Sequence, residues 1–217
     1  MYYMKNKILL TVAAALGLAF AAEAQTVSIG PRVGATFAKL NLSGDDEFTD
    51  EVKDLIQSKP GLQFGAVANV MVNDLFSVQP ELLYVQKGYQ IEEGGVSAKE
   101  TMNYLEVPVL AKISFGSGQV QGFVTAGPSV GYWLSAKNKY EYDGEEETED
   151  YEFEDEDNRT EFGANFGVGL AYKVGAGALN LDVRYGLGLS NLYDDSGDDS
   201  KVKNRVVGVS LAYLFSL

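Results

Sequence analysis

Seven charged side chains recur at alternate positions of segments that are otherwise apolar or rich in glycine. Asp182 and Arg184 are the clearest pair, because they stand in Leu179–Leu189, where every odd-numbered position is apolar. A β-strand points successive side chains to opposite faces, so this spacing places both charges on one face. Such groups offer ion pairing, hydrogen bonding, or proton and ion transfer. The candidates are Arg32, Glu81, Lys87, Glu106, Lys112, Asp182 and Arg184.

Histidine and cysteine are absent from the sequence. The lack of histidine removes the commonest catalytic base and metal ligand, and no serine stands in a nucleophile-elbow context. We therefore predict a non-enzymatic protein with no catalytic residue, no metal centre and no cofactor. Without cysteine there is no disulfide, so the stability of an exported chain must come from its sheet.

Residues 1–24 are predicted to be a secretory signal peptide, which leaves a mature domain of residues 25–217. An apolar run at 8–20 follows two lysines, and Ala22-Glu23-Ala24 supplies the small residues of a cleavage site. Removing two lysines and one glutamate from 17 basic and 31 acidic residues leaves 15 and 30, a net charge of −15. That excess of acid argues against nucleic acid or anionic lipid as a partner.

Eight segments share the two-faced alternation of Leu179–Leu189. One face of each segment is apolar, and the other is polar or small. A tilted strand of about 9–11 residues crosses a bilayer, so each segment is long enough to do so. The segments are 27–37, 61–72, 76–89, 103–115, 119–137, 161–173, 179–189 and 202–217.

The connections between these segments alternate in length. Short turns are expected at 73–74, 116–118 and 174–177. Long, polar, acidic connections are expected at 43–60, 90–101, 138–160 and 193–201. Short periplasmic turns and long external loops are typical of outer-membrane barrels, and an even strand number places both termini in the periplasm. The predicted fold is all-β, an eight-stranded antiparallel up-and-down transmembrane β-barrel.

Aromatic residues on the apolar faces are expected to form two girdles. Those near the short turns are Phe76, Phe115, Tyr172 and Phe215, and those nearer the long loops are Phe37, Tyr84, Tyr132 and Phe162. Phe162 and Tyr172 span roughly 25 Å at about 3.3 Å per residue and about 40° of tilt, close to the height of the apolar band. Girdles of this kind indicate contact with lipid.

The seven charged side chains then face a lumen. Eight strands leave an interior that side chains just fill, so we interpret the charges as a structural network and not as a proton or ion path. Asp182 and Arg184 are expected to find partners on neighbouring strands. The candidates for those partners are Lys112, Glu106, Glu81 and Arg32.

The acidic stretch 141–157 is the most unusual connection. Its carboxylates offer ligands for weak binding of Ca²⁺ or Mg²⁺, the candidates being Glu145, Glu146, Glu147, Glu149, Asp150, Glu154 and Asp155. We favour a solvated loop over a metal site, because no EF-hand spacing is present and a like-charged run repels itself. Aromatic residues alternate with the acids, which favours an exposed hairpin whose edge could pair with a partner strand.

Five segments carry a resemblance to a known family. They are Gly30-Pro31-Arg32-Val33-Gly34, Gln79-Pro80-Glu81-Leu82-Leu83-Tyr84 with Gln86-Lys87-Gly88, Tyr104-Leu105-Glu106-Val107-Pro108-Val109-Leu110 with Lys112, Ala126-Gly127-Pro128 to Tyr132, and Asp182-Val183-Arg184-Tyr185-Gly186-Leu187. Together they resemble the PorT-like outer-membrane β-barrel proteins of Bacteroidetes, an eight-stranded group of OmpX and OmpA size. The resemblance covers about Val27 to Leu217. It implies an integral outer-membrane barrel without assigned enzyme activity, and in one branch a link to protein secretion.

The predicted function is a structural or surface-interaction role in the bacterial outer membrane, carried by acidic external loops. Expected contacts are outer-membrane lipid, lipopolysaccharide or another envelope protein, and the expected state is a monomer. Three alternatives are an accessory component of a secretion or transport assembly, a narrow channel, and a soluble lipocalin-like binder. In the soluble binder the apolar faces of the strands would point inward and the charged faces outward. That arrangement leaves Asp182, Arg184, Glu106 and Lys112 on the outside.

Overall fold

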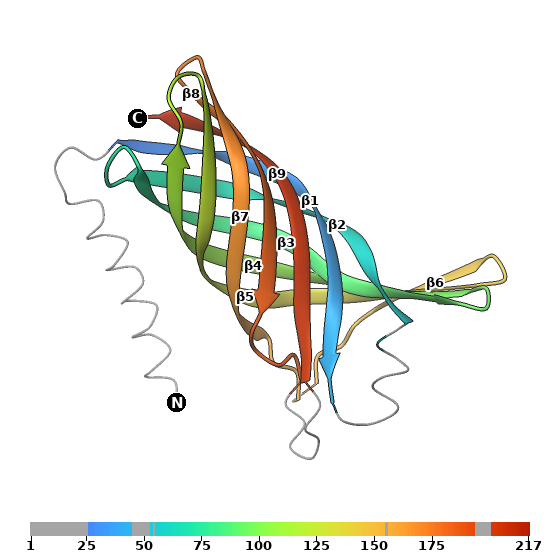
Figure 1. The fold of residues 1–217 in the computed structure, drawn as a ribbon. Coiled ribbons are helices and arrows are strands. Elements are labelled where there is room, and N and C mark those ends of the chain that lie inside the picture. The colour runs from blue at the N-terminus through green and yellow to red at the C-terminus, as the bar shows by residue number, and fades with distance from the viewer. Residues whose placement is uncertain (1–25, 45–52, 54, 155, 194–200) are drawn as a thin grey trace.

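The computed structural model describes residues 26–44, 53, 55–154, 156–193 and 201–217 (Figure 1). The predicted signal peptide, residues 1–24, lies outside them. Within the described ranges, no helix is both long enough and apolar enough to span a membrane.

Antiparallel strands form the whole of the described fold. They are β1 (Val27–Ser43), β2 (Ile56–Met71), β3 (Phe76–Glu93), β4 (Val96–Phe115), β5 (Val120–Tyr142), β6 (Glu145–Asp150), β7 (Thr160–Val174), β8 (Gly177–Gly188) and β9 (Lys201–Ser216). The pairing order is β4-β3-β2-β1-β9-β8-β7-β5, and β4 also pairs with β5, which closes a ring of eight strands. β6 pairs with β5 outside the ring (Figure 1). The predicted eight-stranded up-and-down barrel is confirmed.

The apolar faces of the strands point outward and the charged faces point into the lumen. On β8, Leu181 is 50% exposed, Val183 46% and Tyr185 43%, whereas Asp182 and Arg184 are buried. A wide apolar outer surface is what a lipid-embedded barrel needs. The arrangement is the opposite of the soluble lipocalin-like alternative, which required these charges on the outside.

The predicted aromatic girdles lie on the outer surface. Exposed aromatic side chains at the short-turn end are Phe76, Phe115, Tyr172 and Phe215, and those toward the other end include Phe37, Tyr132 and Phe162. Tyr84 is half-buried because its ring stacks on Phe64, with 5.0 Å between the ring centroids. The girdles flank the apolar band as expected for lipid contact.

Three short turns, the start of β1 and the end of β9 lie at one end of the barrel (Figure 1). In the turn between β2 and β3, the Asn73 side chain accepts hydrogen bonds from the backbone N–H groups of Leu75 and Phe76 at 2.9 and 2.8 Å. The backbone N–H of Leu217 donates to the carbonyl of Val27 at 2.9 Å, so the last residue is held beside the first strand.

The connection predicted as a long loop at 90–101 is instead a continuation of β3 and β4, and that prediction is wrong. Glu93 pairs with Val96, and the turn consists of Gly94 and Gly95. Both glycines have positive φ, +60° and +86°, which glycine adopts without steric cost and which suits a two-residue hairpin. Beyond the membrane the outer face needs no apolar residues, so the alternation fades although the ladder continues.

The region 138–160 likewise contains strand where a loop was expected. β5 runs on to Tyr142, turns at Asp143 and Gly144, and returns as β6. This segment is the exposed hairpin that the alternation of aromatic and acidic residues predicts. It projects from the barrel beside the β3–β4 hairpin, at the end opposite the short turns (Figure 1).

We predict that a charge on the lipid face of β8 destabilises the barrel. Val183 pairs with Val168 near the middle of the apolar band, so Val183→Lys should lower the free energy of unfolding in lipid vesicles by about 2–4 kcal/mol. Val96→Lys is the matched control, because Val96 is similarly exposed (43%) but lies on the projecting hairpin. Its cost should stay within about 0.5 kcal/mol. Equal costs at the two positions would contradict the lipid-facing assignment.

Candidate functional site

The centre of the lumen holds a closed cluster of two arginines and two carboxylates. Arg184 donates to both oxygens of Glu81, with Nη1–Oε2 at 2.7 Å and Nη2–Oε1 at 2.9 Å. Arg32 Nη2 donates to Asp182 Oδ1, and Arg32 Nη1 lies 3.6 Å from Glu81 Oε1. All four side chains are buried. Two-pronged contacts of this kind are the strongest form of carboxylate–arginine pairing.

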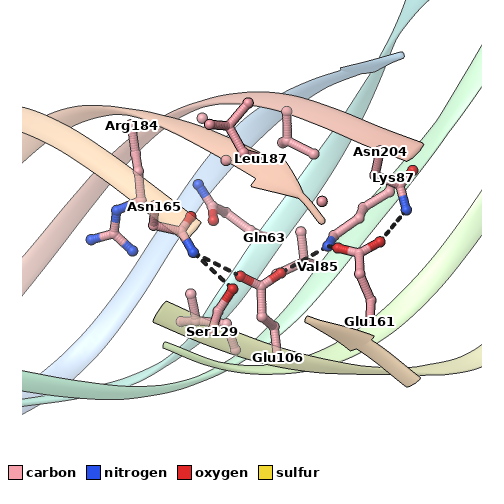
Figure 2. Close-up of a pocket in the computed structure, with 15 residues that line it drawn as sticks. Gln63, Val85, Lys87, Glu106, Ser129, Glu161, Asn165, Arg184, Leu187 and Asn204 are labelled. Carbon is pink, nitrogen blue, oxygen red and sulfur yellow. Dashed lines mark hydrogen bonds and ion pairs between the residues drawn. The ribbon is translucent and has the colours of Figure 1, made fainter. Parts of the chain in front are cut away.

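A second charged layer lies nearer the hairpin end. Lys87 Nζ is 2.9 Å from Glu106 Oε2 and 2.6 Å from Glu161 Oε1. Asn165 donates to Glu106 Oε1 at 3.3 Å, and Asn204 donates to the other oxygen of Glu161 (Figure 2). The neutral amides therefore occupy carboxylate lone pairs that the single lysine does not reach.

The partners of Asp182 and Arg184 are not on neighbouring strands, and that part of the prediction is wrong. Arg32 is on β1 and Glu81 on β3, whereas β8 pairs only with β7 and β9. The adjacent inward positions are too small to take part: those beside Arg184 are Gly167 and Gly208, and those beside Asp182 are Gly169 and Ser210. The long side chains therefore extend over these small residues and meet across the lumen.

Lys112 stands apart from both layers. Its Nζ donates to Asn180 Oδ1 at 3.0 Å and lies 4.0 Å from the ring centroid of Phe123. Among the described residues, no carboxylate lies within ion-pair distance of this amine. The structure thus brings six of the seven predicted lumen residues into two layers and leaves Lys112 nearer the short-turn end.

Glu161 and Asn204 belong to the network, but sequence reasoning did not select them. Both stand at the outer ends of their strands, before the alternation becomes regular. Their positions within the strands could have identified them, because every second residue of a strand lies on the same face. Glu161 shares its face with Gly163, and Asn204 shares its face with Gly208.

The space between the two layers is a cavity of about 30 Å³ (Figure 2). It is lined by residues of both layers, including Lys87, Glu106 and Arg184. A cavity of this size has room for about one water molecule. The lumen is therefore filled by side chains at this level, which argues against the narrow-channel alternative.

The hairpin end of the lumen is closed by an aromatic cap, defined here as Tyr104, Trp133, Tyr151 and Phe153. Trp133 stacks between Tyr104 and Tyr151, at centroid distances of 6.0 and 5.5 Å, and meets the edge of Phe153 at 5.1 Å. Tyr151 and Phe153 belong to the segment after β6, which folds back over the barrel mouth. Arg159 holds this segment by donating to the Trp133 carbonyl at 3.1 and 3.0 Å.

One carboxyl group on the hairpin side of Tyr104 has a strongly raised pKa. Glu100 lies on β4 beyond Leu105, the last lipid-facing residue of that strand, and its side chain is buried. Burial raises the pKa of Glu100 to about 7; a hydrogen bond with Tyr89 opposes the rise, and the nearby Asp157 carboxylate adds to it. Glu100 is therefore about half protonated near neutral pH.

The predicted cation-binding residues of the acidic stretch are spread along the hairpin. Glu145 to Asp150 form β6, so successive carboxylates point to opposite faces. Asp150 pairs with Lys137 at 3.2 Å and Glu146 with Lys139 at 2.8 Å. In the described part of the chain, no three acidic, histidine or cysteine side chains are grouped to hold a metal ion. Glu154 follows β6, Asp155 lies outside the described residues, and cation binding stays a prediction.

The closed ring of strands, the apolar outer band and the charged, filled lumen define an outer-membrane β-barrel. Over residues 23–194 the sequence matches the family described as outer membrane protein beta-barrel domain. The chain belongs to that family, and it is an integral protein of the outer membrane.

Solved structures with a similar fold have low sequence identity to the chain. Ail, the attachment invasion locus protein of Yersinia pestis, is 15% identical, with a TM-score of 0.42, over 87% of this chain and 98% of that one. Neisserial surface protein A is 14% identical, with a TM-score of 0.46, over 86% and 97%. The outer membrane enzyme PagL is 12% identical, with a TM-score of 0.35, over 89% and 100%. No curated protein matches the sequence.

We predict that Asp182→Leu lowers the free energy of unfolding in detergent by about 3–5 kcal/mol, because it leaves the buried Arg32 without its hydrogen-bonded carboxylate. The matched control is Glu92→Leu, which removes an exposed carboxylate lying 3.9 Å from Lys99. That change should cost about 0–1 kcal/mol. An unchanged midpoint for Asp182→Leu would mean that the cluster does not stabilise the barrel.

The cap should lose stability as the pH rises from about 4.5 to about 7. The folded-state pKa of Glu100 exceeds its ordinary value of 4.5, so the folded cap binds the proton more tightly than the unfolded one. The full contribution, up to about 3 kcal/mol, is present below pH 4.5 and is lost above pH 7. Trp133 is the single tryptophan, so its fluorescence during denaturation reports on the cap. Glu100→Gln should abolish this pH dependence, and its persistence in that variant would exclude Glu100 as the cause.

Proposed function

We propose that the protein is a non-enzymatic surface-interaction protein that binds another protein along the free edge of β6. The observation that carries this proposal is the projecting β5–β6 hairpin. Among the described strands β6 pairs with β5 alone, and every residue of β6 is exposed. An unpaired edge of this kind is a template for an incoming strand.

The backbone of β6 has hydrogen-bonding groups that β5 does not use. Tyr142 pairs with Glu145 across the two-residue turn, so the closely bonded pairs alternate from that point along the hairpin. The N–H and C=O groups that point to the free side belong to Glu146, Thr148 and Asp150. They offer an added strand a continuous set of donors and acceptors.

The charge of the edge specifies the chemistry of the partner. β6 has the sequence Glu-Glu-Glu-Thr-Glu-Asp, and lysines of β5 pair with only two of its carboxylates, those of Glu146 and Asp150. The surplus acid attracts a basic strand and repels another copy of the same hairpin. The partner is therefore an extended segment that contains lysine or arginine.

The lumen supports a structural role and not a catalytic one. Arg32, Arg184 and Lys87 are each held by carboxylates, and the cavity between the two layers has room for about one water. The sequence contains no histidine to serve as a base. We infer that these charges fix strand register and close the barrel.

The orientation that fits this role places the termini in the periplasm and the hairpins outside the cell. The short turns, the start of β1 and the end of β9 share one end of the barrel, and the long hairpins share the other (Figure 1). An epitope inserted between Asp143 and Gly144 should be stained on intact cells, and one after Leu217 only after permeabilisation. The reverse pattern would reject this orientation.

The edge proposal predicts that Thr148→Pro weakens strand addition without disrupting the hairpin, because only the outward N–H is lost. The probe is a peptide of alternating lysine and threonine, titrated into the purified protein in nanodiscs. Its affinity should fall about fivefold in Thr148→Pro, the effect of one lost hydrogen bond. Thr148→Val keeps the N–H and should bind as the wild type does. Equal binding by both variants, or no binding by the wild type, would refute the edge proposal.

A second candidate is an accessory role in a secretion assembly. It is favoured by the five segments that together resemble the PorT-like group, one branch of which is linked to protein secretion. Chemical cross-linking in intact cells followed by affinity capture tests it. Recovery of secretion-machinery subunits from the wild type and equally from Thr148→Pro would favour this role over edge binding.

A further inference from the structure

The barrel has a second polar opening at the end opposite the hairpins. Around the short turns a cavity of about 850 Å³ is lined by serine, asparagine and glutamine side chains, by small and apolar residues, and by the charged side chains of Asp74, Lys112 and Lys173. Lys112 lies at its inner boundary, on the face of β4 that points into the lumen. We call this space the inner vestibule.

Lys112 is buried, with 5% of its surface exposed, and it uses little of its hydrogen-bonding capacity. An ammonium group carries three donors, and only the bond to Asn180 is made to a protein acceptor. The ring of Phe123 supports the charge from one side at 4.0 Å. A buried cation without a carboxylate is costly, so an anion that reaches it gains a strong interaction.

The balance of charge along the lumen places a positive surplus at the vestibule. In the layer of Arg32, Glu81, Asp182 and Arg184 the cations and carboxylates are equal in number, and Lys112 adds one positive charge on the vestibule side. The outer layer holds Lys87 against two carboxylates and has the opposite surplus. The described lumen charges are neutral as a whole, but they are separated along the barrel axis.

A second buried polar group without a partner lies beside Lys112. Thr125 is directly opposite Lys112 in the β4–β5 ladder, so the two side chains share one face. Thr125 is 4% exposed, and its Oγ1 makes no hydrogen bond in the structure. A buried hydroxyl without a partner is unusual, but Thr125 is not among the residues that line the vestibule, so we assign the ligand to Lys112 and not to this hydroxyl.

We propose that the inner vestibule is an anion-binding site, in which Lys112 binds a carboxylate or phosphate group. The ligand enters from the short-turn end, and the volume of the vestibule leaves room for a solute larger than the bound group. This site is independent of the β6 edge, which lies at the opposite end of the barrel.

The test is a titration of the purified protein in nanodiscs with inorganic phosphate and, separately, with acetate. The readout is the ¹⁵N shift of the Lys112 amine in lysine-labelled protein, assigned by its loss in Lys112→Met. The proposal expects a saturable shift with at least one anion, and the preferred anion distinguishes a phosphate site from a carboxylate site. Linear, unsaturated shifts with both anions would overturn it.

Two further variants keep the result interpretable if Lys112→Met folds poorly. Thr125→Val keeps the volume and removes a hydroxyl that does not line the vestibule, so it should bind as the wild type does. Lys112→Arg keeps the charge and should retain saturable binding, followed through the other labelled lysines of the vestibule, such as Lys173. Lys137→Met, on the exposed hairpin, should bind as the wild type does. Lost binding in Lys112→Arg, in Thr125→Val or in Lys137→Met would reject the site.

Discussion

The structure depends on one buried cluster, in which Glu81 is held by Arg184 and Arg32, and Arg32 in turn holds Asp182. These charges come from β1, β3 and β8, strands that do not pair with each other. Burying four charges is tolerable only when each meets its partner. The cluster therefore requires the ring to be closed in one register, because a slip of one residue would turn the charges toward lipid.

The two halves of the lumen on either side of this cluster differ in structure. Toward the hairpins, Lys87 and its carboxylates are followed by the aromatic cap, so this half of the lumen is sealed by packing. β5 has 23 residues and β8 has 12, and the excess length becomes the projecting acidic hairpin. Toward the short turns the lumen opens, and Lys112 lies at the inner boundary of the opening. The exposed acidic edge of β6 and the polar vestibule thus lie at opposite ends of the closed barrel.

Much of the barrel could be predicted from the sequence, because lipid imposes strict alternation on the membrane-spanning part of each strand. That constraint identifies Asp182 and Arg184 as inward residues. The constraint ends where the membrane ends. Residues 90–101 are therefore predicted to be a loop, although backbone pairing continues there without an apolar face. It also says nothing about which charges meet. Glycine beside a charged position makes room for the long side chain. Whether that side chain meets a partner on the adjacent strand or on a strand farther round the barrel depends on the curvature of the closed ring.

The central claim is that Glu81 and Arg184 stabilise the barrel as a pair. A double-mutant cycle of Glu81→Leu, Arg184→Met and the combined variant, measured by unfolding in lipid vesicles, tests it most directly. Each single change leaves a buried charge without its partner, whereas the double change leaves an apolar pair of similar volume. We expect the double variant to be more stable than Glu81→Leu alone, with a coupling energy of about 1–3 kcal/mol. Additive losses with no coupling would show that the pair does not hold the barrel together.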